Sequence, residues 1–290
     1  RPVSGGSLVR VADGVVVAGC GWYYGAIATK FDLAGNLVWQ RALGPAGCRR
    51  VALAASAAGV YVAQAEDSGW PQRFAVSRLA TDGRVLGTTE GAATAAYDLR
   101  VFATPDVVYV GTDDRTFALN PGSLAVRWNV GDCRPRDVVP ASAAIGANDV
   151  WCLGSQGFQR RTPDGLVRIA GPLVQPEYNG PSQVRAFDDG VVFVGSRSAR
   201  RLDPLTGQIV WERALLPDGT IGTASIGVGH PHAGSVGVVT STCDLFQTHC
   251  TASIRRLALA DGALVQDFDV DGAPLPSSGA VERDGGDIGM

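Results

Sequence analysis

The sequence predicts an all-β fold, a β-propeller of four-stranded blades. Its clearest phrase, IATKFDLAGNLVWQRAL at residues 27–43, has apolar alternation on both sides of an Asp-x-x-Gly turn. This pattern is typical of a β-hairpin. A second strand-turn-strand pattern lies upstream, as in LVRVADGVVVAG at residues 8–19. The phrase returns with its turn glycines 39 to 55 residues apart, and four-stranded units of about this period indicate propeller blades.

Each repeat contains four strands, A to D. Strands A and B flank a short turn, a loop follows, and strands C and D flank the Asp-Gly turn. In the fourth repeat we expect strands A and B within SAAIGANDVWCLGS, which begins at Ser142. We predict one domain over residues 1–290, with six complete repeats at 7–44, 49–88, 96–132, 141–172, 182–216 and 222–271 and the start of a seventh at 279–290.

Strand D ends on a Trp in three copies of the phrase, at Trp39, Trp128 and Trp211. A lone blade cannot bury both faces of its sheet, so blades must stack around an axis. We therefore predict that these aromatic side chains are buried between neighbouring blades. Residues 279–290 resemble another strand A and the start of a strand B. They either close a six-bladed ring with the first blade or begin a further blade of a longer propeller.

Charge and hydropathy exclude several partners. The net charge is −3 and the pI is about 5.6, so the chain lacks the basic footprint of a nucleic-acid-binding protein. Lys30 is the only Lys, and no P-loop glycines precede it. No apolar run reaches the roughly 18 residues that a membrane-spanning helix needs. We expect neither a nucleic-acid partner nor a membrane span.

The chain has six cysteines and no Cys-x-x-Cys pair. An even number in a fold rich in surface loops favours disulfides and an oxidising compartment, so we expect a secreted, periplasmic or cell-surface protein. Six buried free thiols in a cytosolic protein are the alternative. Three local pairs are the simplest of fifteen connectivities: Cys20 with Cys48, Cys133 with Cys152, and Cys243 with Cys250.

The repeated pattern formed by Asp203, Gly207 and Trp211, relaxed at Asp32, Gly35 and Trp39, resembles the bacterial PQQ-like, or quinoprotein-type, propeller repeat. The first two units, ATKFDLAGNLVWQRALG followed by VALAASAAGVYVAQ, also resemble the SBBP-type repeat. Such repeats occur in dehydrogenases, assembly scaffolds and surface proteins, so the resemblance implies a fold without a function. The quinoprotein dehydrogenases use an adjacent Cys-Cys pair near the quinone together with a calcium site. This chain has no adjacent cysteines.

Two stretches contain metal-ligating residue types. DFDVDG, with Asp267, Asp269 and Asp271, matches the start of a calcium loop, but Ser278 occupies the twelfth position. We interpret the stretch as strand D of the sixth repeat and keep calcium as the alternative. His230 and His232 form a His-x-His pair, while His249 falls at the opposite end of the predicted blade. The sequence therefore predicts no metal site and no resident cofactor.

Aromatic residues gather in the predicted B–C loops, at the same end of the blades as the cysteines. Tyr and Trp are the side chains that binding hot spots favour. Long loops with aromatics and disulfides predict a binding surface, although packing onto the rim of the fold explains them equally well. The candidate ligand-binding residues are Trp22, Tyr23, Tyr24, Trp70 and Phe246.

These observations favour a non-catalytic, secreted or envelope-associated propeller that binds a protein or a glycan. A quinoprotein-like oxidoreductase, or another propeller enzyme, is the alternative. A structural repeat within a larger surface protein is a third reading. No residue pattern supports a catalytic assignment.

Overall fold

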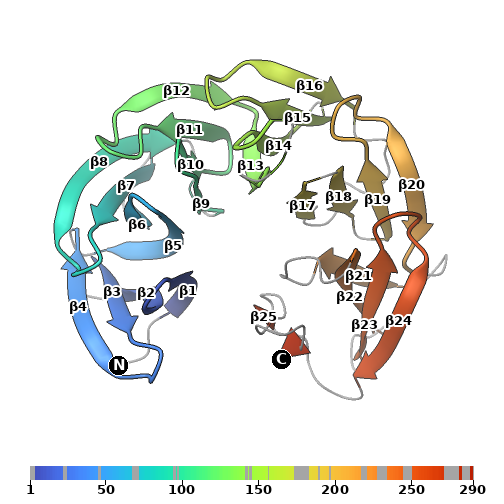
Figure 1. The fold of residues 1–290 in the computed structure, drawn as a ribbon, viewed down its shortest axis with the longest axis horizontal. Coiled ribbons are helices and arrows are strands. Elements are labelled where there is room, and N and C mark those ends of the chain that lie inside the picture. Colours follow the sequence, from blue (N-terminus) through green and yellow to red (C-terminus); the bar gives the residue numbers. More distant parts are fainter. Residues whose placement is uncertain are drawn as a thin grey trace. The chain divides into compact units, whose positions relative to one another are not determined.

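The computed structural model describes residues 4–21, 25–44, 47–66, 72–93, 96, 98–140, 143, 146–155, 157–172, 183–188, 190–195, 197–216, 221–226, 234–243, 250–270, 281–282 and 288–289. All regular structure in these residues is β (Figure 1). Six antiparallel sheets follow one another along the chain, and each has four strands in sequential order. This arrangement is the predicted series of propeller blades.

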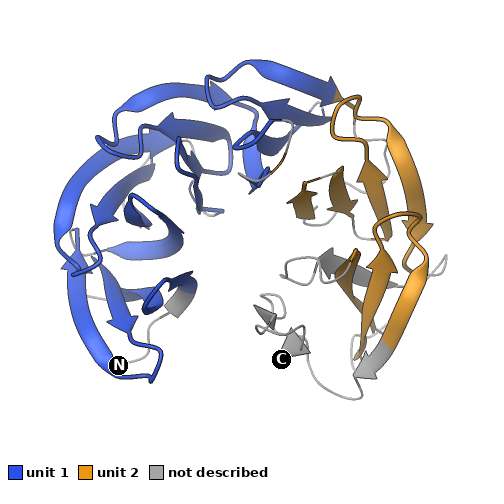
Figure 2. Ribbon diagram, in the orientation of Figure 1, with its two compact units in different colours: residues 1–141, 146–170 blue, residues 142–145, 171–290 orange. Residues whose placement is uncertain are grey.

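The strands form two compact units, residues 1–141 with 146–170, and residues 142–145 with 171–290 (Figure 2). The first four sheets lie in the first unit. They are β1 (Ser4–Val11), β2 (Gly14–Gly21), β3 (Gly25–Phe31) and β4 (Leu37–Leu43); β5 (Cys48–Ser56), β6 (Gly59–Glu66), β7 (Gln72–Leu79) and β8 (Val85–Ala93); β9 (Arg100–Ala103), β10 (Val108–Gly111), β11 (Arg115–Leu119) and β12 (Val126–Gly131); and β13 (Arg134–Val138), β14 (Val150–Gly154), β15 (Gly157–Arg161) and β16 (Val167–Gly171).

The second unit contains the fifth and sixth sheets and a short hairpin. The hairpin pairs two strands within residues 279–290, where the sequence predicts the start of a further repeat. The strands are β17 (Gln183–Phe187), β18 (Gly190–Val194), β19 (Ser198–Leu202) and β20 (Ile209–Ala214); β21 (Ile221–Ile226), β22 (Ser235–Cys243), β23 (Cys250–Ala258) and β24 (Leu264–Val270); and β25 (Val281–Glu282) and β26 (Ile288–Gly289).

The structure corrects one predicted strand. Strand A of the fourth sheet is β13, residues 134–138, and not the stretch that begins at Ser142. The buried positions of β13 are Pro135 and Asp137, so no apolar alternation marks the strand. The strand register also shifts between these two residues, which is where a strand tolerates a proline.

Three C–D turns open on an Asp or Asn whose side chain accepts hydrogen bonds from the turn backbone, at Asp32, Asn120 and Asp203. The Asp32 carboxylate accepts hydrogen bonds from the backbone N–H groups of Ala34 and Asn36 at 2.9 and 2.8 Å. Asp203 does the same for the turn between β19 and β20. Such side chains mimic a backbone turn partner, which is why Asp and Asn recur at this position. Hydrogen bonds from Asn36 hold the pKa of Asp32 below its usual value.

The apolar core of each unit lies between successive sheets. Between the first and second sheets, Val16 and Ala28 pack with Leu53 and Val62. Between the fifth and sixth, Val192 and Val194 pack with Val236 and Val238, and other buried side chains extend each cluster. Each sheet therefore buries a face against its neighbour, as stacked blades must.

The strand-D tryptophans connect neighbouring sheets. The Trp39 indole N–H donates to the Thr81 carbonyl, in the C–D turn of the next sheet, at 2.9 Å. Trp128 donates to Pro163 at 2.8 Å and Trp211 to Leu259 at 2.7 Å in the same way. Trp39 and Trp211 are buried, as predicted, whereas Trp128 stays partly exposed.

Glycine makes this contact possible. A Cβ atom added to Gly83 would lie 2.7 Å from Cδ2 of Trp39. The φ of Gly83 is +81°, which an L side chain rarely adopts. Gly262 meets the Trp211 ring under the same conditions, with a φ of +69°. These turn glycines thus allow the chain to reverse direction and also leave room for the indole rings to pack against the turn.

Candidate functional site

The order of strands gives each sheet two distinct ends. Because consecutive strands are antiparallel, the B–C loops and the D–A connections leave one end, which we call the loop face. The A–B and C–D turns leave the other end, the turn face. The tryptophan contacts lie at the turn face. Within the first unit the A strands β1, β5, β9 and β13 form its inner side and the D strands its outer side (Figure 1).

Two disulfides lie at the loop face of the first unit, and both match the predicted pairing. Cys20–Cys48 joins the end of β2 to the start of β5, so it crosses from the first sheet to the second. Cys133–Cys152 ties the connection between β12 and β13 to β14. In the second unit the backbone register places Cys243 opposite Cys250. Their side chains fall outside the described residues, so the third bridge stays a prediction.

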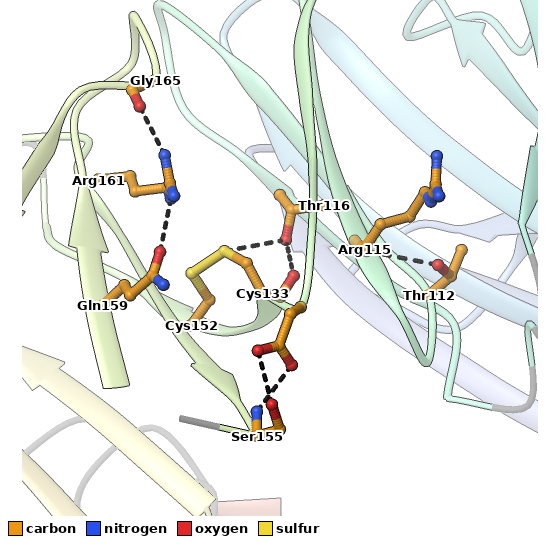
Figure 3. Close-up of a disulfide and its surroundings, with 10 residues drawn as sticks. Thr112, Arg115, Thr116, Cys133, Cys152, Ser155, Gln159, Arg161 and Gly165 are labelled. Carbon is orange, nitrogen blue, oxygen red and sulfur yellow. Dashed lines mark hydrogen bonds between the residues drawn. A yellow bond between two sulfur atoms is a disulfide. The ribbon is translucent and has the colours of Figure 1, made fainter. Parts of the chain in front are cut away.

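Polar contacts hold the connection around Cys133 from both sides (Figure 3). The Thr116 hydroxyl on β11 donates to the Cys133 carbonyl. The preceding residue, Asp132, accepts hydrogen bonds from the Ser155 backbone N–H at 2.7 Å and from its hydroxyl at 2.8 Å. This connection is therefore bound to both the third and the fourth sheet.

Removing the inter-sheet bridge should destabilise the fold without changing it. We expect the double variant Cys20→Ser/Cys48→Ser to lose about 2–4 kcal/mol, because the bridge restricts the unfolded chain between two residues 28 apart in sequence. Urea unfolding of the variant and of the oxidised parent measures the difference. An unchanged midpoint would show that the bridge adds nothing to stability.

A charged cluster also lies toward the loop face of the first unit. Asp98 lies in the connection between β8 and β9, and one of its carboxylate oxygens pairs with Arg100 Nε at 2.9 Å. Its other oxygen receives Arg136 Nη1 from the fourth sheet, also at 2.9 Å. The Asp98 backbone N–H donates to Asp113 at 3.2 Å. Burial raises the pKa of Asp98, but attraction to the two guanidinium groups outweighs it and holds that pKa below its usual value.

Arginines begin three neighbouring A strands of the first unit. We call Arg49 and Arg50 on β5, Arg100 on β9, and Arg134 and Arg136 on β13 the inner-strand arginines. β9 contacts both β5 and β13. Each of these residues lies within the first three positions of its strand, so all lie toward the loop face. Sequence reasoning missed this group, although Cys-Arg-Arg, Arg-Val and Arg-Pro-Arg at the strand starts were a visible signal.

The remaining sequence-predicted site residues are only partly placed. The candidate ligand-binding residues Trp22, Tyr23, Tyr24, Trp70 and Phe246 lie outside the described residues, as do His230, His232, His249 and Asp271. Asp267 and Asp269 belong to β24, as the strand interpretation predicts, and Asp267 forms an ion pair with Arg255 at 3.3 Å. The described part of the chain shows no group of three His, Cys, Asp or Glu side chains able to hold a metal. It also contains no helix with the length and hydropathy to cross a bilayer.

Comparison with known proteins establishes the fold. No protein-family model and no curated protein matches the sequence. Among solved structures, BamB from Moraxella catarrhalis is similar with a TM-score of 0.57 and 14% identity, over 93% of this chain and 78% of that one. The WD40 domain of SCAP from fission yeast is similar with a TM-score of 0.52 and 11% identity, over 97% of this chain and 76% of that one. The chain therefore has a β-propeller fold of four-stranded blades.

Proposed function

We propose that this chain is a non-catalytic interaction propeller that binds a protein partner through its loop face. The observation that carries the proposal is the covalent bracing of that face by Cys20–Cys48 and Cys133–Cys152. A surface that is already rigid loses little conformational freedom when a partner binds, and this lowers the entropic cost of association. The binding role requires no cofactor.

The same disulfides support the proposed location. Disulfides persist in oxidising compartments and are rare in the cytosol. A periplasmic, cell-surface or secreted position therefore fits the two bridges. It also fits the third, predicted between Cys243 and Cys250, whose strand positions face one another across the ladder.

The aromatic residues of the B–C loops are the proposed contacts. We expect the triple variant Trp22→Ala/Tyr23→Ala/Trp70→Ala to lose partner binding while its melting temperature stays nearly unchanged, because truncated hot-spot aromatics cost about 2 kcal/mol or more each. A random-peptide phage library selected on the oxidised protein supplies the binders, and biolayer interferometry measures their affinity.

A matched control removes exposed apolar side chains elsewhere. Leu33, Leu37 and Val126 are at least half exposed and belong to the C–D hairpins of the first unit. Their triple replacement by Ala should leave binding intact. Equal losses in both triple variants, or no enriched peptide at all, would refute the proposal. Dye reduction after addition of pyrroloquinoline quinone and calcium would favour the quinoprotein alternative.

A further inference from the structure

We propose that the inner-strand arginines form a binding site for a carboxylate-rich segment of the protein partner. This inference rests on the proposed function and names the chemistry that the partner must present. Five guanidinium groups begin three adjacent strands at the loop face, and Asp98 is the carboxylate that two of them share.

The cluster keeps donor capacity that its own carboxylates do not use. Arg136 is partly buried, with a side chain 9% exposed, and its buried Nε has no hydrogen-bond partner among the described residues. Arg50 and Arg134 are exposed, and neither guanidinium forms an ion pair with another described residue. A guanidinium carries five N–H donors in a planar fork, so the exposed Arg50 and Arg134 can receive further carboxylate oxygens.

The nearby carboxylates are largely engaged. Asp113 accepts the Asp98 backbone N–H, and Asp132 is bonded twice by Ser155. Asp114 accepts from the Thr112 hydroxyl at 3.0 Å and lies 3.5 Å from Arg115 Nε. Burial, together with repulsion from Arg100 and Arg134, lowers the pKa of Arg136, as expected where like charges crowd. An incoming anion relieves that repulsion.

The chemistry favours a short acidic peptide over an extended polyanion. The guanidinium fork matches the two oxygens of a carboxylate, and Asp98 already uses both of its oxygens on two arginines. The chain as a whole carries a net charge of −3. A long polyanion would meet that opposing field over much of the surface, whereas a segment with a few Asp or Glu residues needs only the local cluster.

Affinity for a defined acidic probe tests the site. The probe is a fluorescein-labelled octapeptide in which Glu alternates with Gly, and the reference peptide has Gln in place of Glu. We expect the Arg50→Gln/Arg134→Gln variant to raise the Kd for the Glu peptide about tenfold in low salt, since each exposed pair contributes modestly. Arg84→Gln/Arg73→Gln removes two other exposed arginines outside the A strands and should leave the Kd unchanged.

The Asp98→Asn variant tests whether the arginines bind the peptide directly, because a purely structural role of Asp98 would not lower the Kd for the Glu peptide. Asp98 competes with the ligand for Arg100 and Arg136, so its neutralisation should lower the Kd about threefold even though it removes two ion pairs from the fold. An unchanged or higher Kd in that variant would overturn the inference. So would equal affinity for the Glu and Gln peptides, or equal losses in the two arginine pairs.

The outcome also separates this inference from the proposed function. Phage-selected peptides that lack acidic residues and depend on the aromatic triple would leave the interaction role standing and remove the carboxylate site. A sulfated oligosaccharide that binds through the same arginines more tightly than the Glu peptide would overturn the assignment to a protein segment.

Discussion

Replacing Trp211 by Ala is expected to lower the free energy of unfolding by about 3–5 kcal/mol. The indole is 8% exposed, its N–H donates to the Leu259 carbonyl at 2.7 Å, and its ring lies on Gly262 of the next sheet. The change removes this packing and leaves a cavity in the core shared by the fifth and sixth sheets. It also removes one of the two hydrogen bonds to the Leu259 carbonyl, which keeps the bond from Arg201 Nη1 at 2.8 Å. Urea unfolding followed by circular dichroism measures the loss.

Two variants separate packing from hydrogen bonding. Trp211→Phe keeps an aromatic ring but has no N–H. Its free energy of unfolding should fall by about 1 kcal/mol for the missing hydrogen bond, and by a further amount because the smaller ring packs less well. Trp128→Ala is the matched comparison, because that indole makes the same kind of contact but is partly exposed. If Trp128→Ala proved more destabilising than Trp211→Ala, burial of the indole would not explain how much each Trp contributes to the free energy of unfolding.

Replacing Asp149 by Leu is expected to cost about 3–5 kcal/mol as well, because it removes the carboxylate that neutralises a buried cation. Asp149 and Arg160 have fully buried side chains and meet at 2.8 Å. The Arg160 guanidinium also lies 5.7 Å from the centre of the Trp151 ring. Burial lowers the pKa of Arg160, which reflects how poorly this interior tolerates the charge.

Removing both charges should recover much of that loss. In Asp149→Leu/Arg160→Met the buried positive charge is removed together with its carboxylate, so the double variant should be more stable than Asp149→Leu alone. Arg168→Gln is the control, because Arg168 contacts the same Asp149 oxygen at 2.7 Å but is 42% exposed. It should cost less than about 1 kcal/mol. A double variant no more stable than Asp149→Leu would contradict the explanation.

The sequence predicted the blade pattern well because turn chemistry is local. Asp32 and Asp203 hydrogen-bond residues two to four positions ahead, so the Asp-x-x-Gly signal needs no knowledge of the fold. Strand A of the fourth sheet escaped prediction because Pro135 and Asp137 occupy its inward positions. The neighbouring sheet covers Pro135, since a Cβ atom on Gly111 would lie 2.1 Å from the Pro135 ring.

The charged cluster could not be predicted for a similar reason. Asp98 and Arg136 are 38 residues apart, and only the stacking of sheets brings them together. The strand starts did show their arginines, but no local rule says which carboxylate they share. The cysteine pairing was easier, because Cys133 and Cys152 are separated only by one strand and its turn.

The tryptophan contacts alternate along the chain. They run from the first sheet to the second, the third to the fourth, and the fifth to the sixth. The strand register shows which residues replace the Trp in two of the other sheets. In the second sheet the corresponding strand-D residue is Gly87, and in the sixth sheet it is Gln266. The second sheet meets the third through a different contact, from the Tyr61 hydroxyl to the Pro121 carbonyl.

The turn glycines of the donor sheets, Gly35, Gly122 and Gly207, recur at intervals of 87 and 85 residues, a steadier spacing than the single-blade period. The described sheets therefore fall into pairs, in which one sheet supplies the indole and the following sheet supplies the turn glycine beside it.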